Sequence, residues 1–429
     1  MSLTQSLALV VFLGAYILIA TELINRVAAA LGGAALMLAL GFTDGDAAFY
    51  SPDAGIDWNV IFLLFGMMVI VGVLKNTGLF EALAIFAAKK AKGRPFKVLV
   101  LLIVITAVAS AALDNVTTVL LIAPVTFLVC ERLALPVVPF LIAEVMASNI
   151  GGAGTLIGDP PNIIIASRGN LSFNDFLVNL GPFAIVMTSV LIGVCRVIFR
   201  KAFTYDPERV AEVMALSEGE AIRDRKLLYQ SLGVLALVLA GFVLHPILHF
   251  QPSVVALLGA GLLVLISSVT VEDAIADVEW ETLVFFMGLF IMVGALVETG
   301  VIGELADYLA TETDGRIVLT VFVLLFVSML LSGIVDNIPY VATMAPVVAT
   351  LVAAQPAGEG NVLWWALALG ADLGGNATAV GASANVVVLG IAKRYGSPIS
   401  FWEFTKYGLV VTLASGICAA PYLYFRYLI

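Results

Sequence analysis

Two aspartate-asparagine pairs, each set in an otherwise apolar stretch, are the residues of this chain best suited to chemistry. Asp114 and Asn115 recur 222 positions later as Asp336 and Asn337. A carboxylate in an apolar medium needs a partner, a cation or a proton, and alternate exposure to two sides would let it carry protons. The amides can grip a hydroxylated neutral solute or complete the oxygen shell of a small cation. The competing interpretation is that each aspartate only caps the helix that follows it.

A second duplicated motif lies further along each half, where residues 149–162 return 223 positions later as 372–385. Its Gly-Gly pairs permit unwound backbone, so its backbone and side chains are candidate ligands for cargo. Together the two motifs supply these predicted binding residues: Asn115, Asn337, Thr117, Gly151, Gly152, Thr155, Asn162, Gly374, Gly375, Thr378 and Asn385, with Asn376 and Ser383 as further side-chain ligands. The competing interpretation is that the glycines only let helices pack closely.

The two copies of this second motif carry acid in different places. Asn149 in the first copy corresponds to Asp372 in the second, and Asp159 corresponds to Ala382. The predicted pocket is therefore asymmetric and acidic, and no basic residue lies within the motifs. Dicarboxylate or sulfate cargo would meet repulsion there unless cations were bound with it. The predicted proton-coupling groups are Asp114, Asp336, Asp159 and Asp372.

The elements that must position these residues are membrane helices. With 61% hydrophobic residues, 12% charged residues and a mean hydropathy of +1.08, the 429-residue chain has too little polar surface for a soluble globule. It must live in a bilayer, where a helix needs roughly 20 apolar residues to cross. The span candidates are Gln5–Glu22, Val27–Gly41, Trp58–Leu74, Phe176–Val197, Leu228–His245, Ser253–Val269, Trp280–Val297 and Tyr407–Tyr424. The first is expected to be a retained span, because no small-residue cleavage site follows it.

The composition argues against several other functions. The net charge is −10, but no long run of like charge exists, so nucleic acid is not an expected partner. Cys130, Cys195 and Cys418 share no metal-ligand spacing, and neither a metal nor a cofactor is expected. No pairing of a nucleophile with a base, and no His-Glu metal motif, is present. A transporter is therefore expected, not an enzyme. Glu144, near the second motif, suits a further proton site and a bond to a neighbouring helix equally well.

Each half can be divided into two plain spans, a third span, an amphipathic stretch, a broken helix pair, an interrupted span and a last span. The broken pairs are predicted re-entrant hairpins with tips near 114–117 and 336–339, because each arm is too short or too polar at one end to cross comfortably. The predicted fold class is an all-α polytopic membrane protein with two inverted-topology repeats, about ten spans and two re-entrant hairpins. The expected boundaries are 1–200 for the first repeat, with an interrupted span at 138–167; 201–227 for a cytoplasmic linker; and 228–429 for the second repeat, with an interrupted span at 362–392.

The basic residues predict an orientation. Hairpins that return to their own side leave five crossings in each half, so the second copy is inverted relative to the first. With both termini outside, 18 of the 21 basic residues fall inside, and only Arg168, Arg316 and Arg426 fall outside, as the positive-inside rule expects. The linker is expected to be partly helical, with a helix start at Asp206-Pro207. The expected location is a prokaryotic plasma (inner) membrane.

Nearly the whole chain resembles the ion transporter superfamily. Residues 112–118, ALDNVTT, and 154–162, GTLIGDPPN, look most like its arsenite permease group, ArsB, with the melanosomal P protein as a close relative. The resemblance implies a scaffold domain and a mobile transport domain that moves as an elevator. It also implies export of trivalent arsenite or antimonite in exchange for protons. Carriers of this family are commonly dimers, although nothing in the sequence marks a dimer interface.

One departure from the superfamily bears on the cargo. Its dicarboxylate carriers have Ser-Asn-Thr at the hairpin tips, where this chain has Asp at both, and this weakens the dicarboxylate interpretation. The leading hypothesis is an arsenite and antimonite exporter in which Asp114 and Asp336 titrate and Asn115 and Asn337 hold cargo. The first rival is a sodium/proton antiporter of the NhaD type. The second is a channel subunit that works with a soluble ATPase partner through the linker.

Overall fold

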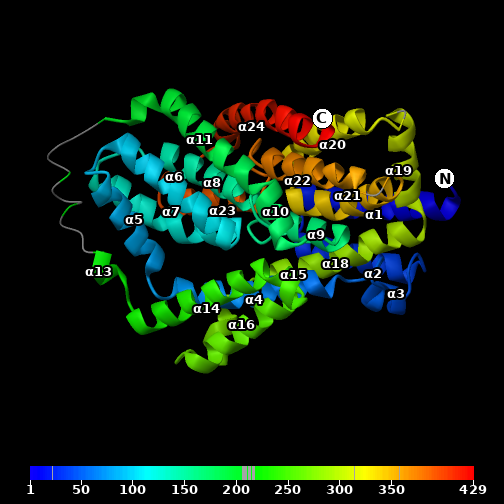
Figure 1. Cartoon of the computed structure of the whole chain (residues 1–429), viewed down its shortest axis with the longest axis horizontal. Coiled ribbons are helices and arrows are strands. Elements are labelled where there is room, and N and C mark those ends of the chain that lie inside the picture. The colour runs from blue at the N-terminus through cyan, green and yellow to red at the C-terminus, as the bar shows by residue number, and fades with distance from the viewer. Residues whose placement is uncertain (22, 205–209, 211–213, 215–217, 314, 357) are drawn as a thin grey trace.

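The computed structural model describes residues 1–429 apart from 22, 205–209, 211–213, 215–217, 314 and 357 (Figure 1). The predicted helix start at Asp206-Pro207 falls outside the described residues. The described first half contains α1 (Leu3–Thr21), α2 (Arg26–Ala39), α3 (Gly45–Tyr50), α4 (Trp58–Lys75), α5 (Leu79–Lys90), α6 (Pro95–Ala112), α7 (Asn115–Arg132), α8 (Val138–Gly152), α9 (Pro160–Gly169), α10 (Phe173–Asn179) and α11 (Gly181–Ile198).

The second half repeats this order. After the short helix α13 (Glu218–Ala221) of the linker, it contains α14 (Arg225–Val243), α15 (His245–Leu248), α16 (Pro252–Ile266), α17 (Val271–Ala276), α18 (Trp280–Glu298), α19 (Val301–Glu312), α20 (Ile317–Ile334), α21 (Asn337–Ala353), α22 (Val362–Gly374), α23 (Ser383–Arg394) and α24 (Phe401–Leu423). The series α4–α9 thus recurs as α18–α23. Across the described residues there are helices and turns but no strand, which confirms the all-α prediction.

Short polar side chains fix where several of these helices begin. Asn25 accepts hydrogen bonds from the first backbone N–H groups of α2, and Asp57 does the same for α4. Asp224 caps α14 through the N–H of Leu227, at 3.0 Å. These residues satisfy N–H groups that have no partner inside the helix, which is why they stand at the starts of apolar runs.

Nine helices in the described part of the chain are long and apolar enough to cross a membrane: α1, α4, α6, α7, α11, α14, α18, α20 and α24 with its continuation. Three of the predicted hairpin arms, α6, α7 and α20, have 18 residues each and a length of about 27 Å, so their length alone does not distinguish them from spans, and the re-entrant hairpins remain a prediction. Conversely, α2 and α16 have only 14 and 15 residues. The predicted span Phe176–Val197 is divided at Leu180 into α10 and α11.

The helices pack as two groups. One, the α4–α18 group, consists of α1, α2, α4, α14, α16 and α18, which contact one another closely. The other, the tip group, consists of α6–α9 and α20–α23, with α11 and α24 along its outer side. Figure 1 shows α4, α14 and α16 along one edge of the molecule and α11, α20 and α24 along the opposite edge. The second motif and both aspartate-asparagine pairs belong to the tip group.

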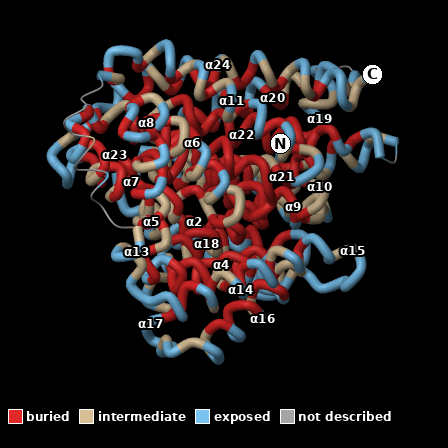
Figure 2. Tube along the Cα trace, turned by 60° about the vertical axis from the view of Figure 1, so that its left-hand side comes forward, coloured by how far each residue is buried: buried red, intermediate tan, exposed pale blue. Residues whose placement is uncertain are grey.

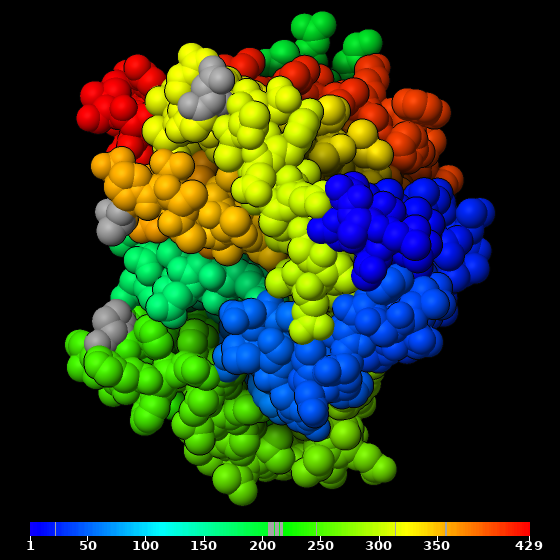
Figure 3. All heavy atoms as spheres, turned by 90° about the vertical axis from the view of Figure 1, so that its right-hand side faces the viewer, coloured from blue at the N-terminus to red at the C-terminus, as the bar shows by residue number. Residues whose placement is uncertain are grey.

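Buried residues fill the middle of the molecule, whereas α15 and the chain ends are exposed (Figure 2). Many large apolar side chains face outward, among them Leu265 at 84% exposed and Ile417 at 74%. Such a surface is suited to lipid, since it would be unusual in contact with water. Figure 3 shows α1 on this outer surface beside the segment drawn in yellow, and the Met1 amino group lies 3.5 Å from Glu304.

Several polar contacts join residues that the charge pattern assigns to the same side of the membrane. On the predicted inner side, Lys75 pairs with Asp277 at 2.8 Å, and Arg223 pairs with Glu81 at 2.7 Å. On the predicted outer side, Arg168 donates to the carbonyl of Asp53 at 2.7 Å. These contacts are compatible with the predicted orientation, which remains a prediction.

Candidate functional site

The two tips are built from the aspartate-asparagine pairs. Asp114 stands before α7 in extended backbone, and its Oδ1 accepts from the N–H of Thr117 at 2.7 Å. At the second tip the position of Thr117 is occupied by Pro339, which has no N–H to donate. Asp336 therefore accepts from the N–H of Ile338 instead, at 3.0 Å. Both aspartates cap the following helix through Oδ1, and the second carboxylate oxygen of each can accept a bond from another group.

The interrupted helices break at matching places. The helix α8 ends at Gly152 and α9 begins at Pro160, while α22 ends at Gly374 and α23 begins at Ser383. Hydroxyl groups tie both breaks to the neighbouring tip helices. Thr155 donates to the carbonyl of Ala111 at 2.6 Å, and Thr378 donates to that of Gly333 at 2.6 Å.

The glycines of the breaks act mainly through close packing. A Cβ on Gly151 would lie 2.2 Å from the carbonyl oxygen of Ala107 on α6, and a Cβ on Gly374 would lie 2.6 Å from that of Met329 on α20. A Cβ on Gly152 would meet the backbone of Gly158 across the break, at 2.4 Å. The alternative considered for these glycines, that they let helices pack closely, therefore describes what they do here.

Amide side chains join the two halves at the centre of the tip group. Asn149 of α8 accepts from Asn115 at 3.3 Å and donates to the side-chain oxygens of Asn376 and Asn385, at 3.0 Å each. Across the same centre, Asn337 donates to both oxygens of Asp159, at 3.4 and 3.3 Å. Residues from both motifs of both halves thus form one buried polar cluster.

A cavity of about 690 Å³ lies between this cluster and the α4–α18 group. Both tip aspartates line it, together with Met67 and Met68 of α4 and Ser383 at the start of α23. The other predicted ligands and proton-coupling residues are not among its lining residues, and most of them are buried behind the tips: Asn115, Asn337, Thr117, Gly151, Gly152, Thr155, Asn162, Gly374, Gly375, Thr378, Asn385, Asp159 and Asp372.

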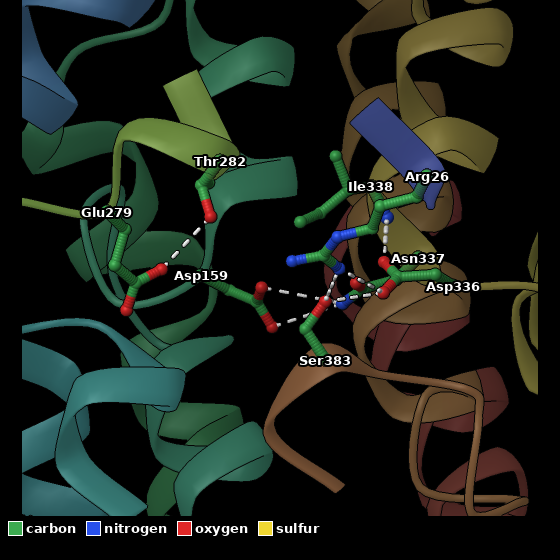
Figure 4. Close-up of polar contacts among 8 residues, drawn as sticks. All are labelled: Arg26, Asp159, Glu279, Thr282, Asp336, Asn337, Ile338 and Ser383. Carbon is green, nitrogen blue, oxygen red and sulfur yellow. Dashed lines mark hydrogen bonds and ion pairs between the residues drawn. The ribbon is translucent and has the colours of Figure 1, made fainter. Parts of the chain in front are cut away.

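One basic residue enters this cavity, and the sequence motifs do not contain it. Arg26, the first residue of α2, donates to the hydroxyl of Ser383 at 3.0 Å and lies 3.9 Å from Asp336 (Figure 4). Ser383 in turn donates to Asp336 at 2.5 Å, and the guanidinium lies 5.6 Å from the ring centre of Phe285. Arg26 therefore links the two helix groups. In the sequence, the one feature that singles out Arg26 is that it interrupts the first apolar run.

The opposite wall of the cavity carries an acid that motif analysis also missed. Glu279 precedes α18, and its Oε2 accepts from the hydroxyl of Thr282 at 3.0 Å (Figure 4). Burial at this wall, and then the charge of Asp114, raises the pKa of Glu279 to about 7. One tip thus faces a base, Arg26, and the other faces an acid. No local sequence pattern marks Glu279, because only the fold brings it to Asp114.

The fold and the site define a multi-pass membrane transporter: apolar helices surround a cavity at two opposed, polar helix breaks. Residues 16–370 match the family model CitMHS, described as citrate transporter, and the chain belongs to this family. It is 58% identical to the uncharacterized transporter Rv2684 of Mycobacterium tuberculosis, over 98% of both chains. The P protein of Sus scrofa is 33% identical over 96% of this chain, which spans 59% of that protein's length.

A solved structure supports the fold. The YdaH transporter of Alcanivorax borkumensis matches 97% of both chains with a TM-score of 0.65 at 15% sequence identity. Kinship with the P protein and the fold of an all-helical, polytopic membrane transporter are thus confirmed. The comparisons support the citrate transporter family and not the arsenite permease group in particular, so arsenite as cargo, proton coupling and elevator movement remain proposals. The mycobacterial relatives are in keeping with a bacterial plasma membrane.

Proposed function

We propose that this chain is a secondary active transporter that exports trivalent arsenite and antimonite in exchange for protons. The observation that carries the proposal is the charge of the cavity. Its lining contains Asp114, Asp336, Glu279 and Glu281. Among the described lining residues Arg26 is the one base, and it already contacts Ser383 and Asp336. Such a cavity repels anions and accepts neutral or positively charged solutes. Arsenous acid is a neutral hydroxylated solute near pH 7, and it can bind amide, hydroxyl and backbone oxygens without a thiol.

The two helix groups supply a route for alternating access. The cavity lies where the tips and the starts of α9 and α23 meet α2, α4 and α18. A sliding movement of the tip group along the α4–α18 group would carry the tips from one side of the membrane to the other, as an elevator. The contact of Arg26 with Ser383 would have to break in each cycle. In the predicted orientation Arg26 and Glu279 lie on the inner side, so this structure would take up cargo from the cytoplasm.

Citrate must be tested because the family description names it. Free citrate would meet the carboxylates of Asp114, Asp336 and Glu279, so we expect it to bind only with a cation or after displacing Asp336 from Arg26. Sodium/proton exchange is the second candidate function. It is favoured by buried oxygens without hydrogen-bond partners near the tips, at Asn115, Asn162 and Asp372. Neither the linker nor any described surface adds support for a soluble ATPase partner or a homodimer.

The test is flux in proteoliposomes with an imposed pH gradient. Arsenite and antimonite should accumulate against their gradients when protons move the opposite way, and accumulation should stop when the pH gradient is collapsed. Citrate with and without Mg²⁺, and sodium, are offered in parallel vesicles. Movement of sodium alone, or of citrate alone, would refute metalloid export and assign the cavity to that solute. Asn115→Ala or Asn337→Ala should abolish metalloid flux, and full flux in both would contradict the assignment.

A further inference from the structure

The duplication permits a direct comparison of Asn149 in α8 with its equivalent, Asp372 in α22. Each lies in the last turn of its helix before the break. Asn149 donates its amide hydrogens to the side-chain oxygens of Asn376 and Asn385, at 3.0 Å each. The amide group of Asn385 donates to two carbonyls of its break, those of Gly375 at 2.8 Å and Thr378 at 2.9 Å, while its side-chain oxygen accepts from Asn149.

The break of the first half has the equivalent hydrogen bonds from an asparagine amide to the backbone, but that asparagine's side-chain oxygen lacks the equivalent donor. Asn162 is the equivalent of Asn385, and it donates to the equivalent carbonyls, those of Thr155 at 3.0 Å and Gly152 at 3.5 Å. Its side-chain oxygen should then accept from the residue equivalent to Asn149. That residue is Asp372, and the two side chains lie against each other. Yet Asn162 Oδ1 and both carboxylate oxygens of Asp372 are buried, and among the described residues none of the three has a partner at ordinary hydrogen-bond distance.

The two halves differ here in one hydrogen-bond donor: Asn149 has an amide hydrogen where an ionised Asp372 has none. An ionised carboxylate can only accept, so Asp372 cannot satisfy Asn162 Oδ1 in that state, and this buried oxygen is left without a donor. A protonated Asp372 carries one O–H and can donate it to Asn162, as the amide of Asn149 donates to Asn385. Leaving buried polar atoms without a hydrogen-bond partner destabilises the folded state. Comparison with the second break therefore indicates that the protonated state of Asp372 supplies the hydrogen bond that the first break lacks.

We propose that Asp372 carries the transported proton and that Asn162 Oδ1 accepts its hydrogen bond when the proton is bound. This inference rests on the proton coupling of the proposed function and names its residue. The step is a proton transfer alone: the carboxylate takes up one proton from the side to which the site is open, an O–H bond forms, and release on the other side reverses it. Asp114 and Asp336 then serve as helix caps that also line the cavity.

The charges around Asp372 support a bound proton. Asp159, at the start of α9, is the acid that faces it most directly, and two neighbouring buried carboxylates are not both ionised at low cost. Other ionisable side chains on the elements packed against α22 have their own partners or lie at helix ends. They are Asp336 before α21, bonded to Ser383; Tyr340 on α21, bonded to Ser328; Glu144 on α8, bonded to Thr126; Arg168 on α9, bonded to Asp53; Glu403 and Lys406 at the start of α24; Tyr407 on α24, packed on Phe199; Tyr422 on α24, bonded to Asn179; and Glu359 before α22.

The test variant is Asp372→Asn, whose amide can donate to Asn162 as Asn149 does in the other half. Two transport modes are compared in proteoliposomes. Exchange of internal for external antimonite needs no net proton movement, and we expect D372N to retain it. Accumulation driven by a pH gradient needs the proton site, and we expect D372N to lose it. Glu144→Gln removes a different buried carboxyl and should keep both modes. Gradient-driven accumulation in D372N, or its equal loss in E144Q, would overturn the assignment.

A cargo-free measurement separates this inference from the proposed function. Purified protein in weakly buffered detergent solution is subjected to a pH jump, and proton uptake is followed with an indicator dye. D372N should take up one proton fewer than the wild type, whatever the wild type transports. Equal uptake would overturn the proton site even if antimonite is transported, and reduced uptake without metalloid flux would overturn only the cargo. A sodium-dependent rise in melting temperature that D372N lacks would assign the site to a metal cation instead.

A second variant keeps the inference testable if D372N does not fold. Asn162→Ser replaces the unsatisfied oxygen by a hydroxyl, which can donate to an ionised Asp372. The ionised state is then favoured, so the pH optimum of gradient-driven accumulation should move to lower pH. An unchanged pH optimum would overturn the pairing of Asn162 with Asp372.

Discussion

Replacing Glu279 by Gln tests the electrostatics of the cavity directly. Glu279 faces Asp114 from the wall formed by α18, and its carboxyl is bonded to Thr282. Burial and then the charge of Asp114 raise the pKa of Glu279 from its usual value of 4.5 to about 7 in the folded protein. Between those two pH values the folded protein holds a proton that the unfolded chain releases. The free energy of unfolding of the wild type should therefore fall as pH rises through this interval.

The size of the effect follows from the interval. At about 1.4 kcal/mol for each pH unit between the two values, the upper limit is about 3 kcal/mol. Solvent at the cavity mouth screens part of this, which leaves about 1–3 kcal/mol. Glu279→Gln stays neutral at every pH. Its advantage over the wild type should therefore be absent below about pH 4.5, grow up to about pH 7, and remain constant above that.

The assay is thermal unfolding of both proteins in detergent from pH 4.5 to 8.5, read by tryptophan fluorescence. Glu312→Gln, an exposed residue of α19 away from the cavity, gives the baseline for removing a carboxylate. Thr282→Val is the matched variant: it removes a hydrogen bond to ionised Glu279, so the loss of stability should extend to higher pH. A melting-temperature difference between E279Q and the wild type that is the same at all pH values would refute the reasoning.

Three further variants test other parts of the structure. Arg26→Gln breaks the charged link between the helix groups and should lower stability by about 1–3 kcal/mol in thermal unfolding, with increased thiol labelling of single cysteines placed along the cavity; unchanged labelling would contradict the link. Gly374→Ala should lower the melting temperature, because its Cβ would press on the backbone of Met329, whereas Gly390→Ala in open space on α23 should not. Thr126→Val should lower the free energy of unfolding by about 1–3 kcal/mol, because it removes the hydroxyl that donates to the buried carboxyl of Glu144 on α8.

Local sequence predicted the elements better than the contacts. The apolar runs locate α1, α4, α14 and α18 to within a few residues, because a bilayer leaves composition as the dominant signal. Phe176–Val197 was misread as one helix, since apolar composition does not report the cap at Ser172 that starts a separate short helix. The sequence places the breaks at the hairpin tips correctly, since α6 ends at Ala112 before Asp114 and α20 ends at Ile334 before Asp336.

The candidate site was predictable where the duplication marks it and not elsewhere. The matching offsets identify Asn162 and Asn385 as equivalents, and their hydrogen bonds to the breaks are the same. Arg26 and Glu279 belong to helix ends outside the motifs, and only the packing of the α4–α18 group against the tips brings them to the cavity. A long-range electrostatic contact of this kind leaves no periodic or local pattern in a single sequence.

The two halves have the same order of helices, but the charged side chains near their tips differ. The tip of Asp336 is held by Arg26, while the tip of Asp114 faces Glu279. Since the pKa of Glu279 is about 7, a proton gained near neutral pH removes a repulsion at one tip and leaves the attraction at the other unchanged. Inside the tip group the halves differ in charge again, because Asp372 occupies the position equivalent to Asn149. Glu279 and Asp372 both belong to the second half of the duplication, so we expect proton binding to change the charge of that half and not of the first.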